Sequence, residues 1–168
     1  MTVELRQLSP NDGRDIYDML QEIQRNDCGV INDVHGMAFD DYLAWLQQQD
    51  DHSRAMNLPE NWIPQTTYFL YIDGVPVGIA KIRHHASEAL EAVGVGSFGY
   101  AIAKSHRGKG YGHLLFRCAM EKCKSHGYTK VKSFVNIDNV PSNKVFVRNG
   151  AKLIGQYQGE RNIYETSL

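Results

Sequence analysis

The sequence predicts one mixed α/β domain over residues 1–168, with a central sheet of about seven strands flanked by helices. Three observations support this fold class. The chain has 168 residues, of which 42% are hydrophobic, so it can bury one sizeable core. Asp73-Gly74 separates two apolar runs and is a strong hairpin signal. A glycine-rich basic turn at residues 107–112 separates an expected strand from an expected helix.

The N-terminal third alternates between periodic and polar segments. Residues 3–8 are expected to form a strand, and the polar residues that follow begin a helix whose apolar residues recur at helical spacing: Ile16, Tyr17, Met19, Leu20 and Ile23. Residues 26–36 are interpreted as a loop, and residues 39–49 as a short helix. Residues 50–65 form a long polar connection, of a length typical of loops that cover a binding site.

The remaining elements alternate strand and helix. The hairpin strands are followed by a loop, a strand, a helix that Gly127 ends, and a further strand–helix–hairpin series. The expected ranges are 66–72 and 75–83 for the hairpin strands, 84–95 for the loop, 97–103 for the next strand, 110–126 for the helix, 129–135 for a strand, 140–148 for a helix, and 152–158 and 162–166 for the closing strands.

Composition restricts the class of protein. Residues 1–13 lack the apolar stretch of a signal peptide, and no run of about 18 apolar residues could span a membrane, so a cytoplasmic location is expected. The three cysteines, Cys28, Cys118 and Cys123, form no C-x-x-C pair, which argues against a disulfide-stapled secreted fold. None of them has a motif histidine nearby in the sequence, so a covalent mechanism through cysteine is not favoured.

The net charge of −1 hides a division of the chain. Residues 1–103 carry 6 Lys or Arg against 15 Asp or Glu, whereas residues 104–152 carry 11 against 2. A basic block that coincides with a glycine-rich turn fits a polyanionic ligand, and the acidic remainder could steer a cationic one. Nucleic acid is the rival partner for the basic block.

The turn at residues 107–112 has the composition of a phosphate-binding loop. Three glycines let successive N–H groups face one point, and the following helix N-terminus adds unpaired donors and a positive dipole end. The string G-x-x-x-x-G-K-[ST] of nucleoside-triphosphate sites is absent. G-x-G-x-x-G occurs at residues 94–99, but it precedes a strand instead of opening a helix, so a dinucleotide site is not favoured.

The R-x-x-G-x-G spacing of Arg107, Gly110 and Gly112 resembles the GNAT superfamily of N-acetyltransferases, as does the whole segment YAIAKSHRGKGYGHLL at residues 100–115. A second match begins at Asn139, with a small residue three positions later and a glycine eleven positions later. The string Ile82-Arg83-His84 also resembles a bacterial subgroup of predicted acetyltransferases with undefined acceptors.

The resemblance implies a GNAT-like fold with acetyl-CoA as co-substrate. It implies a bulge in residues 100–103 that separates this strand from the next, with the Ile102 N–H polarising the thioester carbonyl. The residues it assigns to coenzyme binding are Ala101, Ile102, Ala103, Arg107, Gly108, Lys109, Gly110, Tyr111, Gly112, Asn139, Ser142, Asn143 and Phe146. From the residues alone, Asn139 could also be a plain helix N-cap, and the two roles are compatible.

One residue departs from the family pattern. Many members carry a tyrosine seven positions after the Asn139 equivalent, where it can protonate the leaving thiolate, whereas this chain has Phe146. For the base we consider His84, His85, Tyr100 and Glu88, and we choose His84 and Tyr100 as catalytic candidates. His84 could also be a partly exposed strand-end histidine, and Tyr100 a core aromatic residue. No metal site is expected.

The predicted activity is transfer of an acetyl group from acetyl-CoA to a primary amine by direct attack in a ternary complex. A small-molecule amine is the expected partner. Neither a nucleic-acid partner nor a membrane is expected, and the formation of a homodimer is left open. Two alternatives remain: a catalytically weak acyl-CoA-binding regulatory module, because of Phe146, and a nucleic-acid-binding protein that uses residues 104–152.

Overall fold

The structure, a computed structural model, describes residues 1–27 and 29–168. The mixed α/β class predicted from the sequence is confirmed. The elements are β1 (Val3–Gln7), α1 (Arg14–Gln21), β2 (Asn26–Asp27), β3 (Val30–Ile31), α2 (Phe39–Ser53), β4 (Gln65–Ile72), β5 (Val75–Arg83), α3 (Glu88–Ala92), β6 (Phe98–Ile102), the 3-10 turn η1 (Lys104–His106), α4 (Tyr111–Ser125), β7 (Lys130–Asn136), α5 (Val140–Arg148), β8 (Lys152–Tyr157) and β9 (Arg161–Ser167).

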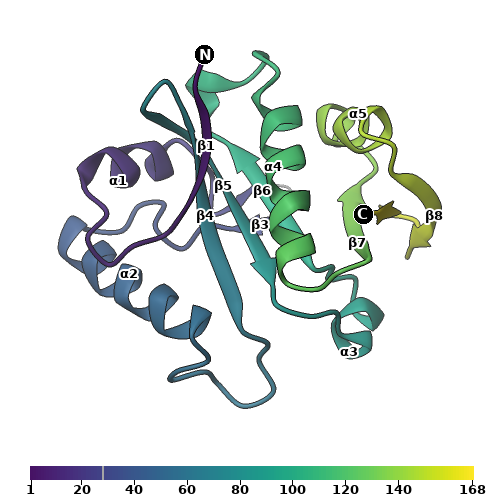
Figure 1. Cartoon of the computed structure of the whole chain (residues 1–168), viewed down its shortest axis with the longest axis horizontal. Coiled ribbons are helices and arrows are strands. Elements are labelled where there is room, and N and C mark those ends of the chain that lie inside the picture. Colours follow the sequence, from purple (N-terminus) through teal and green to yellow (C-terminus); the bar gives the residue numbers. More distant parts are fainter. Residues whose placement is uncertain (28) are drawn as a thin grey trace.

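The expected central sheet is divided into two parts (Figure 1). One part is antiparallel with strand order β1-β4-β5-β6, and the other is antiparallel with order β7-β9-β8. In the described chain β6 and β7 form no ladder, and a hydrogen bond from the Ser97 N–H to the Lys132 carbonyl (3.1 Å) joins them where both strands begin. The two strands therefore diverge toward their carboxyl ends.

The expected bulge in residues 100–103 is absent. The pairing of β5 with β6 runs without a register shift from Ile82 and Phe98 to Gly78 and Ile102. A register shift lies instead between β4 and β5, at Leu70/Tyr71. Because β6 is paired on one side only, it can leave β7 without an inserted residue, so the separation is present and the predicted cause of it was wrong.

Helices cover both faces of the four-stranded sheet. In Figure 1, α1 and α2 lie on one side of it and α4 lies on the other. Side chains alternate along β5 accordingly: Ile79 packs in the core under α1 and α2, whereas Ala80 and Ile82 pack in the core under α4. Two hydrophobic cores result, one on each face.

Several predicted boundaries need correction. Residues 26–36 contain the short hairpin β2–β3, because Val30 is buried in the core under α1 and α2. The expected loop at residues 84–95 contains α3, whose start the Ser87 side chain caps by accepting a hydrogen bond from the Leu90 N–H (3.2 Å). The hairpin turn is confirmed, since Asp73 and Gly74 both have positive φ angles (50° and 80°), as a type I′ turn requires.

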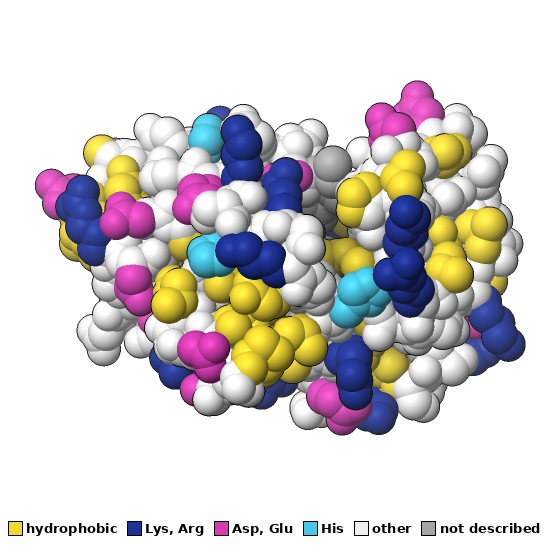
Figure 2. Space-filling view, turned by 90° about the horizontal axis from the view of Figure 1, so that it is seen from above, with side chains coloured by type: hydrophobic (Ala, Val, Ile, Leu, Met, Phe, Trp, Pro, Cys, Tyr) yellow, Lys and Arg dark blue, Asp and Glu magenta, His cyan; other side chains and the backbone are white. Residues whose placement is uncertain are grey.

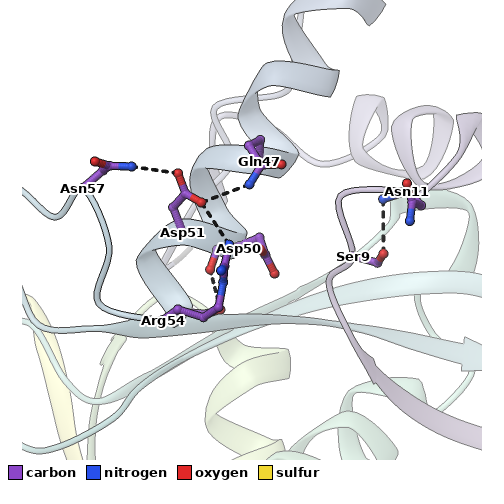
Figure 3. Close-up of polar contacts among 8 residues, drawn as sticks. Ser9, Asn11, Gln47, Asp50, Asp51, Arg54 and Asn57 are labelled. Atoms are coloured by element: carbon purple, nitrogen blue, oxygen red, sulfur yellow. Dashed lines mark hydrogen bonds and ion pairs between the residues drawn. The ribbon is translucent and has the colours of Figure 1, made fainter.

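The connection between α2 and β4 is anchored where it leaves the helix. Helix α2 continues to Ser53, beyond the predicted end at residue 49. The Asp51 carboxylate accepts hydrogen bonds from Asn57 and Gln47 (3.0 Å each) and from Arg54 (3.1 Å), as Figure 3 shows. The hydrogen bonds from Asn57 and Gln47 lower the pKa of Asp51. The first residues of the connection are therefore held against the end of α2.

Candidate active site

The glycine-rich turn adopts a conformation that requires glycine at two positions. Gly108 and Gly110 have φ angles of 76° and 81°, in the left-handed region, and Gly110 is the N-cap of α4. A Cβ at either position would meet no atom within 4 Å. The requirement is therefore conformational, since there is open space in front of both residues.

The backbone amides after Arg107 are unpaired. Within the described residues, no hydrogen-bond acceptor lies against the N–H groups of Gly108, Lys109, Gly110, Tyr111 and Gly112. The first paired amide of the helix is that of His113, which donates to the Gly110 carbonyl (3.1 Å). Five free donors at a helix N-terminus form a site that an anion can occupy.

Arg107 braces this turn. Its Nε donates to the Ile102 carbonyl (2.9 Å), and its Nη2 pairs with the Asp27 carboxylate on β2. The guanidinium therefore ties the turn to β6 and β2 and has less capacity for an incoming phosphate. Lys104 and Lys109, both exposed, are the remaining cations beside the free amides.

The gap between β6 and β7 exposes backbone groups of β6. The Ala103 N–H donates to the Val77 carbonyl (2.9 Å), so by the alternation of an antiparallel ladder Ala101 also bonds to β5. The intervening residues, Tyr100 and Ile102, therefore direct their backbone groups toward the β7 side. Since Arg107 occupies the Ile102 carbonyl, the Ile102 N–H is the free group nearest the open end of the gap.

The side chain of Tyr100 lies between α4 and α5. Its hydroxyl is 3.3 Å from the Ser142 Oγ, its ring stacks on Phe98 (centroids 5.6 Å apart), and burial raises its pKa. Gly112, in the first turn of α4, lies beside this side chain: a Cβ there would make ordinary van der Waals contacts, 3.4 to 3.8 Å from Val145 and Tyr100. Tyr100 thus joins the two segments that resemble coenzyme-binding motifs.

The Asn139 and Asn143 side chains hold the start of α5. The Asn139 Oδ1 accepts the Ser142 N–H (3.3 Å), which is the N-cap arrangement considered from the sequence. Asn143 Nδ2 donates to the carbonyls of Asn136 and Asn139 (2.9 Å each). Its Oδ1 accepts from the Asn162 amide and, at 2.7 Å, from a tyrosine hydroxyl on β9. Asn143 therefore fixes α5 to the ends of β7 and β9.

Phe146 is a core residue with 2% of its surface exposed. Its ring stacks on Tyr164 (centroids 5.1 Å apart) and meets Phe116 edge-on at 5.0 Å. The Tyr100 ring lies 6.5 Å away in the same aromatic cluster. Phe146 has no proton to donate. Tyr100 and Tyr164 both bring a hydroxyl to this cluster: that of Tyr164 donates to the Asn143 Oδ1 (2.7 Å), whereas that of Tyr100 lies beside Ser142.

A cavity of about 740 Å³ opens beside β6. It lies toward the α2 side of the sheet, and its wall is drawn from many segments of the chain. The lining residues come from β2 and β3 with residue 33, from the end of α2, from the connection at residues 58–65, from β5 (Lys81, Arg83), from residues 90–99, and from β7 and β9 (Phe134, Asn136, Arg161). The long connection therefore does reach a cavity, as its length predicted.

The charged side chains of this cavity are mostly basic. Lys81, Arg83 and Arg161 line it, against Asp33 as the acidic residue. The Lys81 Nζ donates to the Ile31 carbonyl (2.7 Å), and burial lowers the pKa of Lys81 to about 8. Folding brings basic residues of β5 and β9 together at this wall, which the division of charge along the sequence did not predict.

His84 lies outside this cavity. It follows β5 on the α4 side, where its Nε2 is 2.7 Å from the Thr66 Oγ1 and its ring stacks on His126 (centroids 4.4 Å apart). This placement does not support His84 as the base, since its neighbours belong to the opposite face of the sheet. His85 and Glu88, the other candidates, are exposed and also do not line the cavity.

Cysteines and metals add nothing to this site. Burial raises the pKa of Cys123 to about 12 and also raises that of Cys118, so both thiols of α4 are poor nucleophiles. Cys28 lies outside the described residues. Over residues 1–27 and 29–168 there is no group of three or more His, Cys, Asp or Glu placed to hold a metal ion. Within the same ranges, every helix is too short or too polar to cross a membrane.

The basic wall of the cavity was not predicted from the sequence, although one signal was present. Lys81 and Arg83 are two positions apart on a predicted strand, so both face the same side of the sheet. Arg161, on β9, gave no such signal because its approach depends on how the two sheets diverge. The glycines at residues 94–99, set aside as a nucleotide motif, also line the cavity.

Figure 2 shows the end of the molecule where the free amides lie. The surface is hollowed between the two halves of the fold, and Lys, Arg and His side chains gather on both sides of the hollow. A gap between diverging strands, a helix N-terminus with unpaired amides and an adjoining cavity together define a site for a long ligand with an anionic end.

Comparison with known proteins identifies the class. Residues 31–151 match the family model described as the acetyltransferase (GNAT) family. The chain therefore belongs to the GNAT family of acetyltransferases, and the resemblance seen in its two motifs is confirmed. No curated protein matches the chain.

Solved structures show the same fold at low sequence identity. A GNAT-family acetyltransferase from Streptococcus pneumoniae is 16% identical with a TM-score of 0.64, covering 99% of each chain. The PaiA N-acetyltransferase from Thermoplasma acidophilum, in complex with coenzyme A, is 15% identical with a TM-score of 0.61 over 100% of both chains. An acetyltransferase from Salmonella typhimurium that modifies the N-terminal serine of ribosomal protein L7/L12 is 16% identical with a TM-score of 0.67, over 100% of this chain and 96% of that one.

The histidine pair predicts a pH-dependent stability. Burial and the neighbouring His126 and His85 lower the pKa of His84, and burial and Lys122 lower that of His126. Below about pH 6.5 the unfolded chain binds protons that the folded chain resists, so the free energy of unfolding should fall from pH 7.5 to pH 5.5. Urea unfolding at pH 7.5 and at pH 5.5 measures this difference in the free energy of unfolding. The variant His126→Gln should show a smaller difference. An equal fall in the variant contradicts this reading of the pair.

Proposed function

We propose that this protein transfers an acetyl group from acetyl-CoA to a primary amine by direct attack in a ternary complex. The observation that supports this proposal is the row of five unpaired amides, residues 108–112, at the end of α4 that adjoins the gap between β6 and β7. The neighbouring cavity provides room for the amine. Coenzyme A in the Thermoplasma acidophilum relative supports the choice of co-substrate.

In this proposal the coenzyme spans the two motifs. The amides of Gly108, Lys109, Gly110, Tyr111 and Gly112 bind the pyrophosphate, and Arg107 holds the turn in shape. The pantetheine arm lies along β6, where the Tyr100 and Ile102 backbone is free and where Ala101 and Ala103 keep the strand bonded to β5. Asn139 and Ser142 line the arm from α5, while Asn143 and Phe146 hold α5 in position.

The chemistry needs few groups from the protein. The amine nitrogen attacks the thioester carbonyl carbon, the C–N bond forms, and the C–S bond breaks to release coenzyme A as its thiolate. The Ile102 N–H donates to the oxygen that becomes negative. The proton of the amine leaves to solvent through the cavity, and the Tyr100 hydroxyl donates a proton to the thiolate in place of the tyrosine that position 146 lacks. Tyr100 then regains a proton from solvent, so that no net proton is consumed.

The amide site predicts a charge effect that is specific to one end of α4. Gly110→Asp places a negative charge among the free donors, so the affinity for coenzyme A should fall about tenfold or more. Calorimetry at fixed ionic strength measures it. Gly127→Asp is the matched control, because Gly127 also has a positive φ (88°) and open space around it, at the other end of α4.

The control variant should bind coenzyme A within about twofold of the original affinity, since its charge lies a whole helix away. Equal losses in both variants would mean that backbone strain, and not the amide site, governs the affinity. Retained affinity in Gly110→Asp would remove these amides from the coenzyme site.

The role of Tyr100 predicts a loss of turnover without a loss of coenzyme affinity. Tyr100→Phe keeps the ring and removes the acidic hydrogen, so kcat should fall about tenfold or more while the coenzyme A Kd changes less than threefold. Thiol release measures kcat. Tyr17→Phe, whose hydroxyl bonds the Met37 carbonyl (2.6 Å), is the control and should keep its kcat. An unchanged kcat in Tyr100→Phe contradicts the assignment.

A thiol-release screen tests the activity itself. Acetyl-CoA with a panel of primary amines should release coenzyme A in proportion to the acetylated amine formed. Tight coenzyme binding with no thiol release across the panel would instead favour the regulatory module considered from Phe146.

A further inference from the structure

Two arginines of the cavity are fixed in place by one glycine-containing segment. Arg83 on β5 donates from Nη1 to the Gly96 carbonyl (2.7 Å), and Arg161 on β9 donates from Nη1 to the Gly94 carbonyl (2.7 Å). The two residues come from different sheets, and both line the cavity. Each guanidinium therefore uses one N–H group for a hydrogen bond within the protein and has other N–H groups available for a ligand.

These charges are not neutralised by the protein. Within residues 1–27 and 29–168, no carboxylate lies within 4.0 Å of either guanidinium: Glu91, close in sequence to this segment, pairs instead with Lys132 (3.0 Å). Burial lowers the pKa of Arg83, whose guanidinium has thus lost part of its hydration. A partly buried cation without a counter-charge is unfavourable, and a bound anion would relieve it.

Three positions of the segment that holds the arginines have no room for a side chain. A Cβ at Gly96 would lie 2.5 Å from the Lys132 carbonyl oxygen, and one at Gly99 would lie 2.5 Å from the Gly29 carbonyl oxygen. Gly94 combines a φ of 77° with a Cβ position 2.6 Å from the Tyr157 ring. The glycines of residues 94–99 therefore shape the arginine side of the cavity, which explains a motif that the coenzyme site does not use.

The rest of the wall mixes apolar and neutral polar residues, with one acidic residue; the neutral polar residues include Asn26, Gln49, Asn61, Gln65 and Asn136. Asp33 lines the cavity, and its carboxylate is 3.7 Å from the Arg25 guanidinium. A ligand that fits has an anionic group for the arginines, an apolar body for the opposite wall, and an amine. The apolar residues that line the cavity are Val30, Ile31, Leu58, Trp62, Ile63, Leu90, Val95, Phe98 and Phe134.

We propose that the acetyl acceptor is an amine that also carries a carboxylate and an apolar side chain, of the kind found in apolar α-amino acids, with Arg83 and Arg161 binding the carboxylate. This inference rests on the proposed function for the transfer step. The carboxylate is bound between two planar guanidiniums, a geometry suited to bidentate hydrogen bonds. The amine is then left to face the acetyl group.

A matched set of amines tests the proposal. L-Phenylalanine, L-phenylalaninamide and phenethylamine share the ring and the amine but differ in the carboxylate. With acetyl-CoA, kcat/KM for phenylalanine should exceed that for the other two by about tenfold or more, which is the worth of one charged hydrogen-bonded contact. 1-Amino-2-phenylethylphosphonate distinguishes a carboxylate site from a site for any anion: the proposal expects it to react more slowly than phenylalanine.

Variants of the two arginines test whether they cause the preference for a carboxylate. Arg83→Gln and Arg161→Gln should each raise the KM for phenylalanine about tenfold and leave that for phenethylamine within twofold. They lie on different strands, so one remains informative if the other fails to fold. Arg117→Gln, an exposed arginine of α4 outside the cavity, is the control and should change neither value.

Binding measured without acetyl-CoA separates this inference from the proposed function. Calorimetry should show that phenylalanine binds and that Arg83→Gln weakens the binding about tenfold. With no thiol release, that result would support the carboxylate site while overturning the transfer reaction. Faster transfer to phenethylamine, to the amide or to a peptide with an N-terminal serine would overturn the carboxylate proposal while leaving the transferase intact. Failure of phenylalanine to bind or react would also overturn it.

Discussion

The site depends on one constraint, the incomplete pairing of β6. This strand bonds to β5 along its whole length, whereas its contact with β7 ends at the Ser97–Lys132 hydrogen bond. Unpaired backbone groups are costly in an interior and useful where a ligand replaces the missing strand. The same divergence separates the starts of α4 and α5, and it lets the cavity collect side chains from β5 and β9. The proposed coenzyme site and the proposed acceptor cavity therefore share one structural origin.

Much of the fold follows from local sequence signals. Asp73-Gly74 fixes a hairpin through its turn chemistry, and the glycines at 108, 110 and 127 mark the two ends of α4, because each needs a positive φ. Signals that depend on tertiary contact were misread. The polar Asn26 and Asp27 gave no hint of β2, which forms because Val30 has to be buried beside them. The bulge was expected from the resemblance, yet one-sided pairing made it unnecessary.

The candidate site likewise contains some features that could be predicted from the sequence and others that could not. The amides of residues 108–112 could be predicted because their geometry is set by glycine and a helix start. His84 could not be placed, since the face of the sheet toward which a residue just past the end of a strand turns depends on the neighbouring chain. Asn143, which the resemblance assigns to coenzyme binding, makes four hydrogen bonds that hold α5, and nothing in the sequence indicated these bonds. The basic cavity could not be predicted, because it depends on which strands come together where β6 and β7 diverge. No single segment of the sequence contains that information.

The central claim is that the unpaired amides and the gap beside them bind coenzyme A. Amide chemical shifts followed by two-dimensional NMR during a titration with coenzyme A test it most directly. The account predicts the largest shifts at Gly108, Lys109, Gly110, Tyr111 and Gly112, together with Ile102, and little change at the opposite end of α4 around Gly127. Shifts confined to other parts of the surface, or saturable binding that leaves these six amides unmoved, would contradict it.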